Sequence, residues 1–238
     1  MAHILITGGS RGIGAAMVRA FAGEGHHVSF TYLHSEEQAR ALAEECGALA
    51  ICADNADSAA VTRAVAAAEQ SWGGVDILIN NAGISSFGVL GAISDEEWRR
   101  MMAVNVDGAF YYTKAVLPHM IHRKSGRIIN ISSIWGLTGA SCEVHYSTSK
   151  AALIGFTRAL ARELGPSGIT VNCIAPGAVD TDMNGPLPQE ALDALCEETP
   201  LGRLGTPEEI AAVALFLAGE GASFITGQVI SPNGGICI

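Results

Sequence analysis

Tyr146 and Lys150 are the first residues in the sequence whose types and spacing could carry out chemistry together. They stand at the two ends of the segment Tyr-Ser-Thr-Ser-Lys, and Ser133 comes thirteen positions before the tyrosine. If this segment is helical, residues four apart share a face, so the ammonium would lie beside the phenol. A nearby positive charge lowers a tyrosine pKa from about 10 toward neutrality, which suits a general acid that protonates a forming alkoxide. Taken alone, the pattern is more typical of an ordinary surface helix.

A turn rich in glycine, Thr-Gly-Gly-Ser-Arg-Gly-Ile-Gly, follows the first apolar run and leads into a helical pattern. Glycines there let the backbone approach a pyrophosphate, which the free N–H groups and dipole of a helix N-terminus stabilise. The spacing differs from the G-x-G-x-x-G of the standard dinucleotide fingerprint, so a tight turn without a ligand is an alternative. Its position after the very first strand favours a cofactor site. We expect dinucleotide contacts from Gly8, Ser10, Arg11, Gly12, Ile13 and Gly14.

The end of the second apolar run bears on the choice between NAD and NADP. About 20 residues after such a turn, an acid would bind the ribose 2′-hydroxyl and repel a 2′-phosphate. From Thr31 to Ser35 the chain has no acid, although Glu36 and Glu37 follow directly. Arg11 could pair with the 2′-phosphate, or it could be a surface side chain. The sequence favours NADP(H), with further contacts from Tyr32, His34 and Ser35.

Three further motifs are placed to meet a cofactor or a substrate. Asn80-Asn81-Ala82-Gly83 follows the fourth apolar run, and Pro176-Gly177 follows the sixth. The carboxyl ends of parallel strands meet at one edge of a sheet, where doubly wound folds bind their cofactors. Asn105 lies inside a long helical pattern, which is a poor place for asparagine by propensity.

Short apolar runs alternate with helical patterns along the whole chain and would position these motifs. The apolar runs are His3–Thr7, His27–Tyr32, Ala48–Ala53, Val75–Asn80, Arg127–Ser132, Thr170–Ala175 and Gln228–Ser231. The helical patterns are Ile13–Glu24, Glu36–Cys46, Ser58–Trp72, Asp95–His122, His145–Leu164 and Pro207–Ala218, with N-caps at Ser58 and Ser94 and stops at Gly25, Gly47 and Gly73. Apolar runs without alternation predict parallel strands buried on both faces, joined by right-handed βαβ units.

The predicted fold is therefore a single α/β domain spanning residues 1–238. It is a Rossmann fold with a seven-stranded, doubly wound parallel sheet and helices on both faces. One long irregular stretch, residues 176–206, is rich in proline and glycine. A connection of that length in a compact domain is typically a lid, so we expect it to cover the substrate.

Composition excludes several classes of protein. A content of 49% hydrophobic and 16% charged residues supports a large buried core. A formal net charge of -10 argues against nucleic acid and anionic membranes as partners. The six cysteines are scattered without a C-x-x-C pair, as expected for free thiols in a reducing cytosol. With no signal-peptide pattern and no apolar stretch near the roughly 20 residues that span a bilayer, we expect a cytoplasmic protein without a metal site.

Taken together, the motifs resemble those of the short-chain dehydrogenase/reductase family over essentially the whole chain. The shared motifs are the T-G-x-x-x-G-x-G turn, N-N-A-G, the helical asparagine, the serine, Y-x-x-x-K and P-G. The resemblance implies that Tyr146 donates a proton to a carbonyl that Ser133 polarises, while Lys150 binds the nicotinamide ribose. It implies that Asn105 supports a water-mediated proton relay. Further implied cofactor contacts are Asp54 beside the adenine, Thr181 at the carboxamide, and Asn55, Asn81, Ala82, Gly83, Pro176, Gly177 and Val179. The family usually forms homotetramers, with the helices around Asn105 and Tyr146 at one interface.

The substrate is less sharply indicated than the chemistry. Residues 202–209 and the ending at 226–235 are similar to those of bacterial 3-oxoacyl-[acyl-carrier-protein] reductases, which implies a ketone linked to a carrier. Carrier protein is acidic, however, and so is this chain. Arg123 and Lys124 match one basic position of those reductases, whereas Ser167 stands where a basic residue is common.

Trp135 and Glu143 lie between Ser133 and Tyr146 and are candidate substrate contacts. An acid is expensive to bury beside an acyl thioester unless it is paired. Glu143 would therefore face solvent, pair with His145 or another subunit, or bind a substrate that carries an amine. The segment also resembles elongation factor P 5-aminopentanone reductases, whose protein-linked ketone substrate is cationic. Other ketones, hydroxysteroids among them, are further alternatives.

Two hypotheses come from other classes of protein. An inactive, cofactor-binding regulatory subunit would keep the fold but lose the four residues Asn105, Ser133, Tyr146 and Lys150, all of which are present. A nucleotide-sugar epimerase or dehydratase would have a similar glycine turn, and it would normally be longer, with a distinct C-terminal substrate domain.

Overall fold

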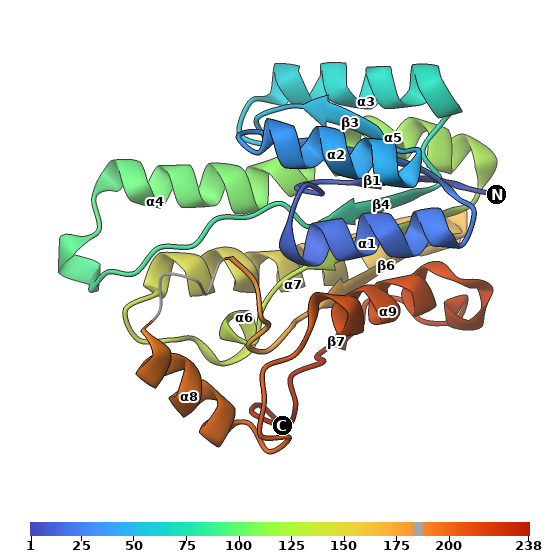
Figure 1. Cartoon of the computed structure of the whole chain (residues 1–238). Helices are drawn as coiled ribbons and strands as arrows, with labels where there is room; N and C mark the ends of the chain where they lie inside the picture. The colour runs from blue at the N-terminus through green and yellow to red at the C-terminus, as the bar shows by residue number, and fades with distance from the viewer. Residues whose placement is uncertain (183–187) are drawn as a thin grey trace.

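The computed structural model describes residues 1–182 and 188–238, and within them it shows one α/β unit built on a seven-stranded sheet (Figure 1). The strands are β1 His3–Ile6, β2 His27–Tyr32, β3 Leu49–Cys52, β4 Ile77–Asn80, β5 Gly126–Ile131, β6 Ile169–Ile174 and β7 Val229–Ile230. Their order is β3-β2-β1-β4-β5-β6-β7, and every pairing is parallel. The predicted fold is thus confirmed, with strand ends displaced by about two residues at most. The strand order reverses between β1 and β4, and ligands of doubly wound folds bind beyond the carboxyl ends of strands at such a point.

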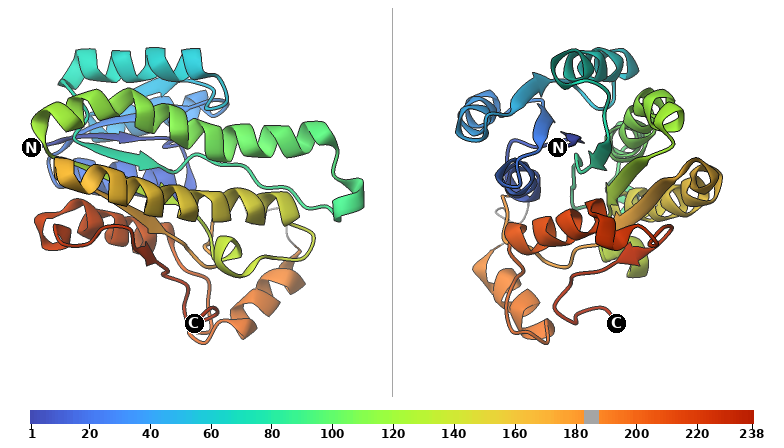
Figure 2. Two further views of the ribbon diagram at one scale, coloured as in Figure 1. Left: turned by 180° about the vertical axis from the view of Figure 1, so that it is seen from behind. Right: turned by 90° about the vertical axis from the view of Figure 1, so that its right-hand side faces the viewer.

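The helices are α1 Gly12–Gly23, α2 Glu36–Cys46, α3 Ser58–Trp72, α4 Asp95–Met102, α5 Gly108–Arg123, α6 Trp135–Thr138, α7 Val144–Leu164, α8 Gln189–Glu198 and α9 Pro207–Ala218. Helices α1, α2 and α9 cover one face of the sheet, and α3, α5 and α7 cover the other (Figure 2). Alternate strand residues feed the two cores: Ile4 and Ile6 of β1 face the first, and Leu5 faces the second. Burial on both faces explains why the strands show no polar alternation.

Several predicted helix boundaries are confirmed and others are wrong. Ser94 caps α4 in a reciprocal capping box with Glu97. Ser58, by contrast, is the first helical residue of α3, because the Asp57 carboxylate before it accepts the N–H of Ala59 and takes the capping position. Gly47 and Gly73 end α2 and α3 as expected. Helix α1 ends with Glu24 at the C-cap position. The predicted stop, Gly25, is the next residue, and its φ is +80°.

The long helix predicted over Asp95–His122 is interrupted. Helices α4 and α5 run on from one another, but the segment Ala103–Asp107 between them is π-helical and holds Asn105. Figure 2 shows this α4–α5 rod lying alongside α7. A π-helical turn inserts one extra residue into a helix, and such turns often mark functional sites.

The stretch predicted to cover the substrate, residues 176–206, is not wholly irregular, because α8 lies within it. Part of the stretch, 183–187, lies outside the described residues. Its two ends are tied together: the Asp180 N–H donates to the Gly205 carbonyl at 2.9 Å, and the Gly205 N–H donates to the Ala178 carbonyl at 2.9 Å. The two ends of segment 178–205 therefore lie side by side where the segment joins the rest of the fold.

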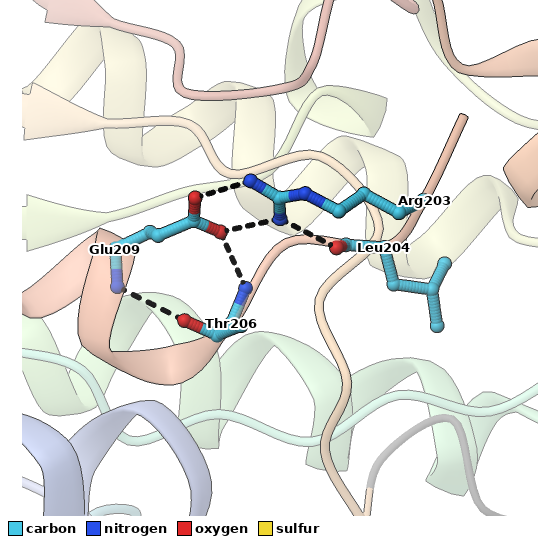
Figure 3. A network of polar contacts seen from close by, with 4 residues as sticks. All are labelled: Arg203, Leu204, Thr206 and Glu209. Carbon is cyan, nitrogen blue, oxygen red and sulfur yellow. Dashed lines mark hydrogen bonds and ion pairs between the residues drawn. The ribbon is translucent and has the colours of Figure 1, made fainter. Parts of the chain in front are cut away.

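A polar network fixes the chain where segment 178–205 ends and α9 begins (Figure 3). The Arg203 guanidinium donates to both carboxylate oxygens of Glu209, at 2.6 and 2.8 Å. Glu209 also accepts the N–H of Thr206 at 2.8 Å, and the Thr206 hydroxyl accepts the N–H of Glu209 in return. Arg203, with the Thr206 N–H, lowers the pKa of Glu209 to about 2.

In the described part of the chain, no helix has the length and apolar character needed to cross a bilayer.

Candidate active site

The glycine turn after β1 and the N-N-A-G motif after β4 are locked together at the carboxyl edge of the sheet. The Thr7 hydroxyl accepts the N–H groups of Asn81 and Ala82, both at 3.0 Å. The Asn81 side-chain amide donates back to the carbonyls of Thr7 and Gly8, again at 3.0 Å. At Gly8, where φ is +64°, a Cβ would come within 2.8 Å of the Ala82 Cα, so only glycine fits. The two motifs predicted to meet the cofactor therefore form one continuous backbone surface.

Arg11 occupies the N-cap position of α1, so the glycine turn ends on a helix N-terminus. Its side chain is exposed and makes no ion pair with any described residue. Arg11 lines a cleft of about 410 Å³ that it shares with Gln38 of α2 and with the first turn of α9. A Cβ at Gly12 would lie 3.4 Å from the Thr181 Cγ2, so the chain after β6 also reaches the glycine turn, as predicted.

The side chains beyond β2 and β3 lie at the same edge. His34 is exposed, and Ser35 takes the N-cap position of α2 without a side-chain capping bond. Glu36, whose negative charge would repel a 2′-phosphate, forms an ion pair with Arg40 at 2.6 Å. Asp54 is held by Arg100 of α4, a partner that sequence analysis missed.

Tyr146 and Lys150 share a face of α7, as their spacing predicts, and both are buried. The Lys150 Nζ lies 5.6 Å from the centroid of the Tyr146 ring and donates to the Ile131 carbonyl at 2.9 Å. A Cβ on Gly83 would lie 3.2 Å from that Nζ and 3.3 Å from the Asn105 Oδ1. The catalytic candidates Lys150 and Asn105 and the cofactor candidate Gly83 therefore converge on one place.

Burial, more than charge, controls the titration of the pair. It raises the pKa of Tyr146 to about 12; a hydrogen bond with Ser133 opposes this rise, and the nearby Glu143 carboxylate adds to it. Burial also lowers the pKa of Lys150 to about 8. The lowered tyrosine pKa expected from the sequence is thus wrong for this structure. At neutral pH the phenol keeps its proton, the state from which a proton donor starts.

Asn105 joins the N-N-A-G segment to helix α7. From the π-helical turn, its amide accepts the N–H of Ile84 at 2.8 Å and donates to the carbonyl of the same residue at 3.0 Å. The amide also donates to the Ser149 hydroxyl at 2.9 Å, and that hydroxyl donates to the Tyr146 carbonyl at 2.7 Å. Asn105 therefore holds α7 in register with the end of β4.

Ser133 and the two substrate candidates lie on the other side of Tyr146. The Ser133 hydroxyl accepts the N–H of Trp135 at 3.2 Å, where α6 begins. Glu143 is 8% exposed, and burial raises its pKa. It sits at the N-cap position of α7 without capping the helix. One of the alternatives for Glu143, a pairing with His145, is not found; the His145 Nε2 bonds instead to the Ser86 hydroxyl at 2.7 Å. Among described residues, the carboxylate of Glu143 has no hydrogen-bonding or ionic partner.

Comparison with known proteins agrees with this geometry. Residues 8–237 match the family model described as Enoyl-(Acyl carrier protein) reductase. The 3-oxoacyl-[acyl-carrier-protein] reductase FabG of Chlamydia trachomatis is 41% identical over 237 residues, covering 98% of this chain and 96% of the relative. The acetoacetyl-CoA reductase of Rhizobium meliloti is 42% identical over 232 residues, covering 97% and 96%. A solved structure of a Serratia marcescens short-chain dehydrogenase/reductase mutant, 41% identical, superposes with a TM-score of 0.94 over 100% of this chain and 98% of that one.

Proposed function

Because the chain belongs to the short-chain dehydrogenase/reductase family, we propose that it is an NADPH-dependent reductase that converts a ketone to a secondary alcohol. The proposed substrate is a 3-oxoacyl thioester, in line with the names of the relatives. The observation that carries the proposal is the convergence of Ser133, Tyr146, Lys150 and Asn105 beside the glycine turn. That convergence also argues against an inactive regulatory subunit.

The residues at the sheet edge fit a nicotinamide dinucleotide. Gly8 and Gly83 leave space against neighbouring atoms that a Cβ would fill, and α1 presents its N-terminus to the same place. A reduced nicotinamide bound there would supply the hydride that the carbonyl carbon of a ketone takes up. We assign the remaining contacts to Ser10, Arg11, Gly12, Ile13, Gly14, Tyr32, His34, Ser35, Asp54, Asn55, Asn81, Ala82, Pro176, Gly177, Val179 and Thr181.

Each side chain of the site has its own role in proton transfer. The Ser133 hydroxyl, which already bonds with Tyr146, orients the carbonyl oxygen of the substrate. Tyr146 then donates its phenolic proton to that oxygen. Lys150, with a pKa of about 8, is mostly an ammonium at neutral pH, so its charge stabilises the phenolate that remains. Asn105 keeps the catalytic helix in place and supports the return of a proton through water.

The preference for NADPH rests on Arg11 and on the lack of an acid at positions 33–35, directly after β2. Arg11 is unpaired among the described residues, whereas Glu36 is occupied by Arg40. We expect NADPH to bind at least tenfold more tightly than NADH, a difference of about 1.4 kcal/mol. Arg11→Ala should abolish that difference. Arg19→Ala, which alters the same cleft at a residue already paired with Glu45, should keep it. Equal affinities in the unmodified protein would refute the assignment.

The direct test of the function is oxidation of NADPH with an acetoacetyl thioester as substrate. We expect turnover that requires both components and yields the 3-hydroxyacyl thioester. A protein that binds NADPH but turns over no member of a panel with a thioester, a hydroxysteroid ketone, a diketone and an aminoketone would refute it.

Glu143 favours a second candidate, a ketone that carries an amine, as in the elongation factor P 5-aminopentanone reductases. A buried carboxylate without a partner, close enough to raise the pKa of Tyr146, is costly unless a cation joins it. Glu143→Gln should then impair an aminoketone at least tenfold more than a thioester. The exposed acid Glu96 provides a control, because Glu96→Gln should leave both activities unchanged. Equal losses on both substrates would place Glu143 outside substrate recognition.

We further propose that the enzyme is a cytoplasmic homotetramer. Phe110 of α5 is 46% exposed and Val144 of α7 is 38% exposed, so both helices offer apolar surface outside the fold. Sedimentation of the pure protein should give four times the 24.6 kDa of the chain. A monomer at micromolar concentration would contradict the proposal.

A further inference from the structure

Arg100 and Asp54 come together from two elements far apart in the chain. Asp54 follows β3 at the carboxyl edge of the sheet, and Arg100 belongs to α4, 46 residues later. The Arg100 Nη1 donates to the Asp54 Oδ2 at 3.1 Å, and its Nη2 donates to Oδ1 at 3.3 Å. Two parallel bonds between a guanidinium and a carboxylate fix the plane of the carboxylate as well as its position.

The hydrogen bonds leave the Asp54 carboxylate with a defined vacancy for one donor. A carboxylate offers about four acceptor positions, two on each oxygen. Oδ1 accepts from Arg100 and from the Ala56 N–H at 2.9 Å, so both of its positions are occupied. Among the described residues, Oδ2 accepts only from Arg100. The Asp54 side chain is 33% exposed, so a small donor can reach it from solvent.

The family resemblance implies that the adenine lies beside Asp54, and the exocyclic amino group of adenine is a donor that this vacancy can accept. Asp54 lies beyond β3, on the side of the switch point where His34 and Tyr32 follow β2. Among the described charged groups, His34 and Arg100 act on Asp54, and the buried Tyr112 of α5 is affected by its charge. Burial raises the pKa of Asp54, but the Ala56 N–H, Arg100 and His34 outweigh it, so the pKa lies below its usual range.

We propose that Arg100 is a positioning residue for the adenine end of the cofactor. It holds the Asp54 carboxylate ionised and oriented, with the open side of Oδ2 directed to the adenine amino group. The inference rests on the proposed function only in that the chain binds a nicotinamide dinucleotide. It does not depend on the preference for NADPH, nor on the identity of the ketone.

Neighbouring arginines supply a matched control. Arg99 precedes Arg100 on the same helix, but it pairs with Asp95 and Glu96 of that helix, away from Asp54. Arg100→Gln should weaken NADPH and NADH alike by about three- to tenfold, as expected for the loss of one or two charge-assisted bonds. Arg100→Lys should lose less, because it keeps the charge without the fork. Arg99→Gln should bind both cofactors as the unmodified protein does.

Binding of the two halves of the cofactor shows which half the Arg100 substitution affects. Competition by adenosine 5′-monophosphate against NADPH fluorescence should weaken in Arg100→Gln by the same factor as NADPH itself. Competition by nicotinamide mononucleotide should not change. Asp54→Asn should lose adenosine monophosphate affinity too, and adding Arg100→Gln to it should cost less than Arg100→Gln costs alone, because the two residues act as a unit.

The pH dependence separates positioning from a general structural effect. Without the guanidinium, burial still raises the Asp54 pKa, so adenosine monophosphate affinity should fall at a higher pH in Arg100→Gln than in the unmodified protein. If Arg100→Gln and Arg99→Gln bind adenosine monophosphate equally, or if the double variant is additive, the inference is overturned. If the unmodified protein binds neither NADPH nor NADH, the proposed function fails as well, so the two failures are distinguishable.

Discussion

Replacement of Lys150 by methionine should make the protein more stable while it removes activity. The side chain is buried at 4% exposure, and burial lowers its pKa from 10.5 to about 8. At pH 7 the folded protein therefore holds a buried positive charge. The fall in the Lys150 pKa from 10.5 to about 8 corresponds to a loss of roughly 3 kcal/mol of unfolding free energy. Methionine leaves the Ile131 carbonyl without its donor, a loss of about 1 kcal/mol. The net gain expected at pH 7 is thus about 2 kcal/mol.

The sign of the pH dependence follows from linkage. Between pH 8 and 10.5 the unfolded lysine binds its proton more tightly than the folded one, so the unmodified protein gains stability as pH rises through this window. The advantage of Lys150→Met should accordingly shrink from pH 7 to pH 10. Urea unfolding at several pH values measures both, and Lys114→Met, at an exposed lysine of α5, should show no such trend. A variant that is less stable than the unmodified protein at pH 7, or an advantage independent of pH, would refute the argument that burial sets the lysine pKa.

Two further variants test how the site is built. Gly83→Ala should fold and weaken turnover about tenfold, because its Cβ would press within 3.2 Å of the Lys150 Nζ; steady-state kinetics beside a thermal melt would separate the two effects, and full activity would show that the nitrogen moves freely. Thr206→Ala should lower the unfolding free energy by about 1 kcal/mol through loss of the α9 cap, measured by urea unfolding, and an unchanged midpoint would mean that Arg203 and Glu209 hold the helix start by themselves.

Much of the fold could be predicted because it depends on local pattern. Unbroken apolar runs identify the buried parallel strands, and motifs at strand ends meet at one edge once the strands are parallel. The π-helical turn at Asn105 could not be predicted, since an extra residue in a helix leaves no trace in apolar periodicity. Helix α8 was missed because prolines and glycines around it dominate the pattern of residues 176–206.

The electrostatics of the site depended on tertiary packing, and sequence reasoning failed there. The spacing of Tyr146 and Lys150 correctly predicts a shared helix face, yet it says nothing of how deeply both are buried. Desolvation therefore reverses the expected direction of the tyrosine pKa. The Arg100–Asp54 pair likewise joins segments that no periodicity relates. Glu143 was singled out from sequence by its place in the loop, whereas the lack of a partner emerges only from the fold.

Activity and cofactor binding of Tyr146→Phe test the central claim most directly. Phenylalanine keeps the buried ring beside Lys150 and removes only the hydroxyl that would donate the proton. NADPH should bind the variant within about twofold of its affinity for the unmodified protein, and ketone reduction should fall by at least about a thousandfold. A variant that binds NADPH and retains a tenth or more of the activity would show that the proton comes from another group, and it would contradict the account.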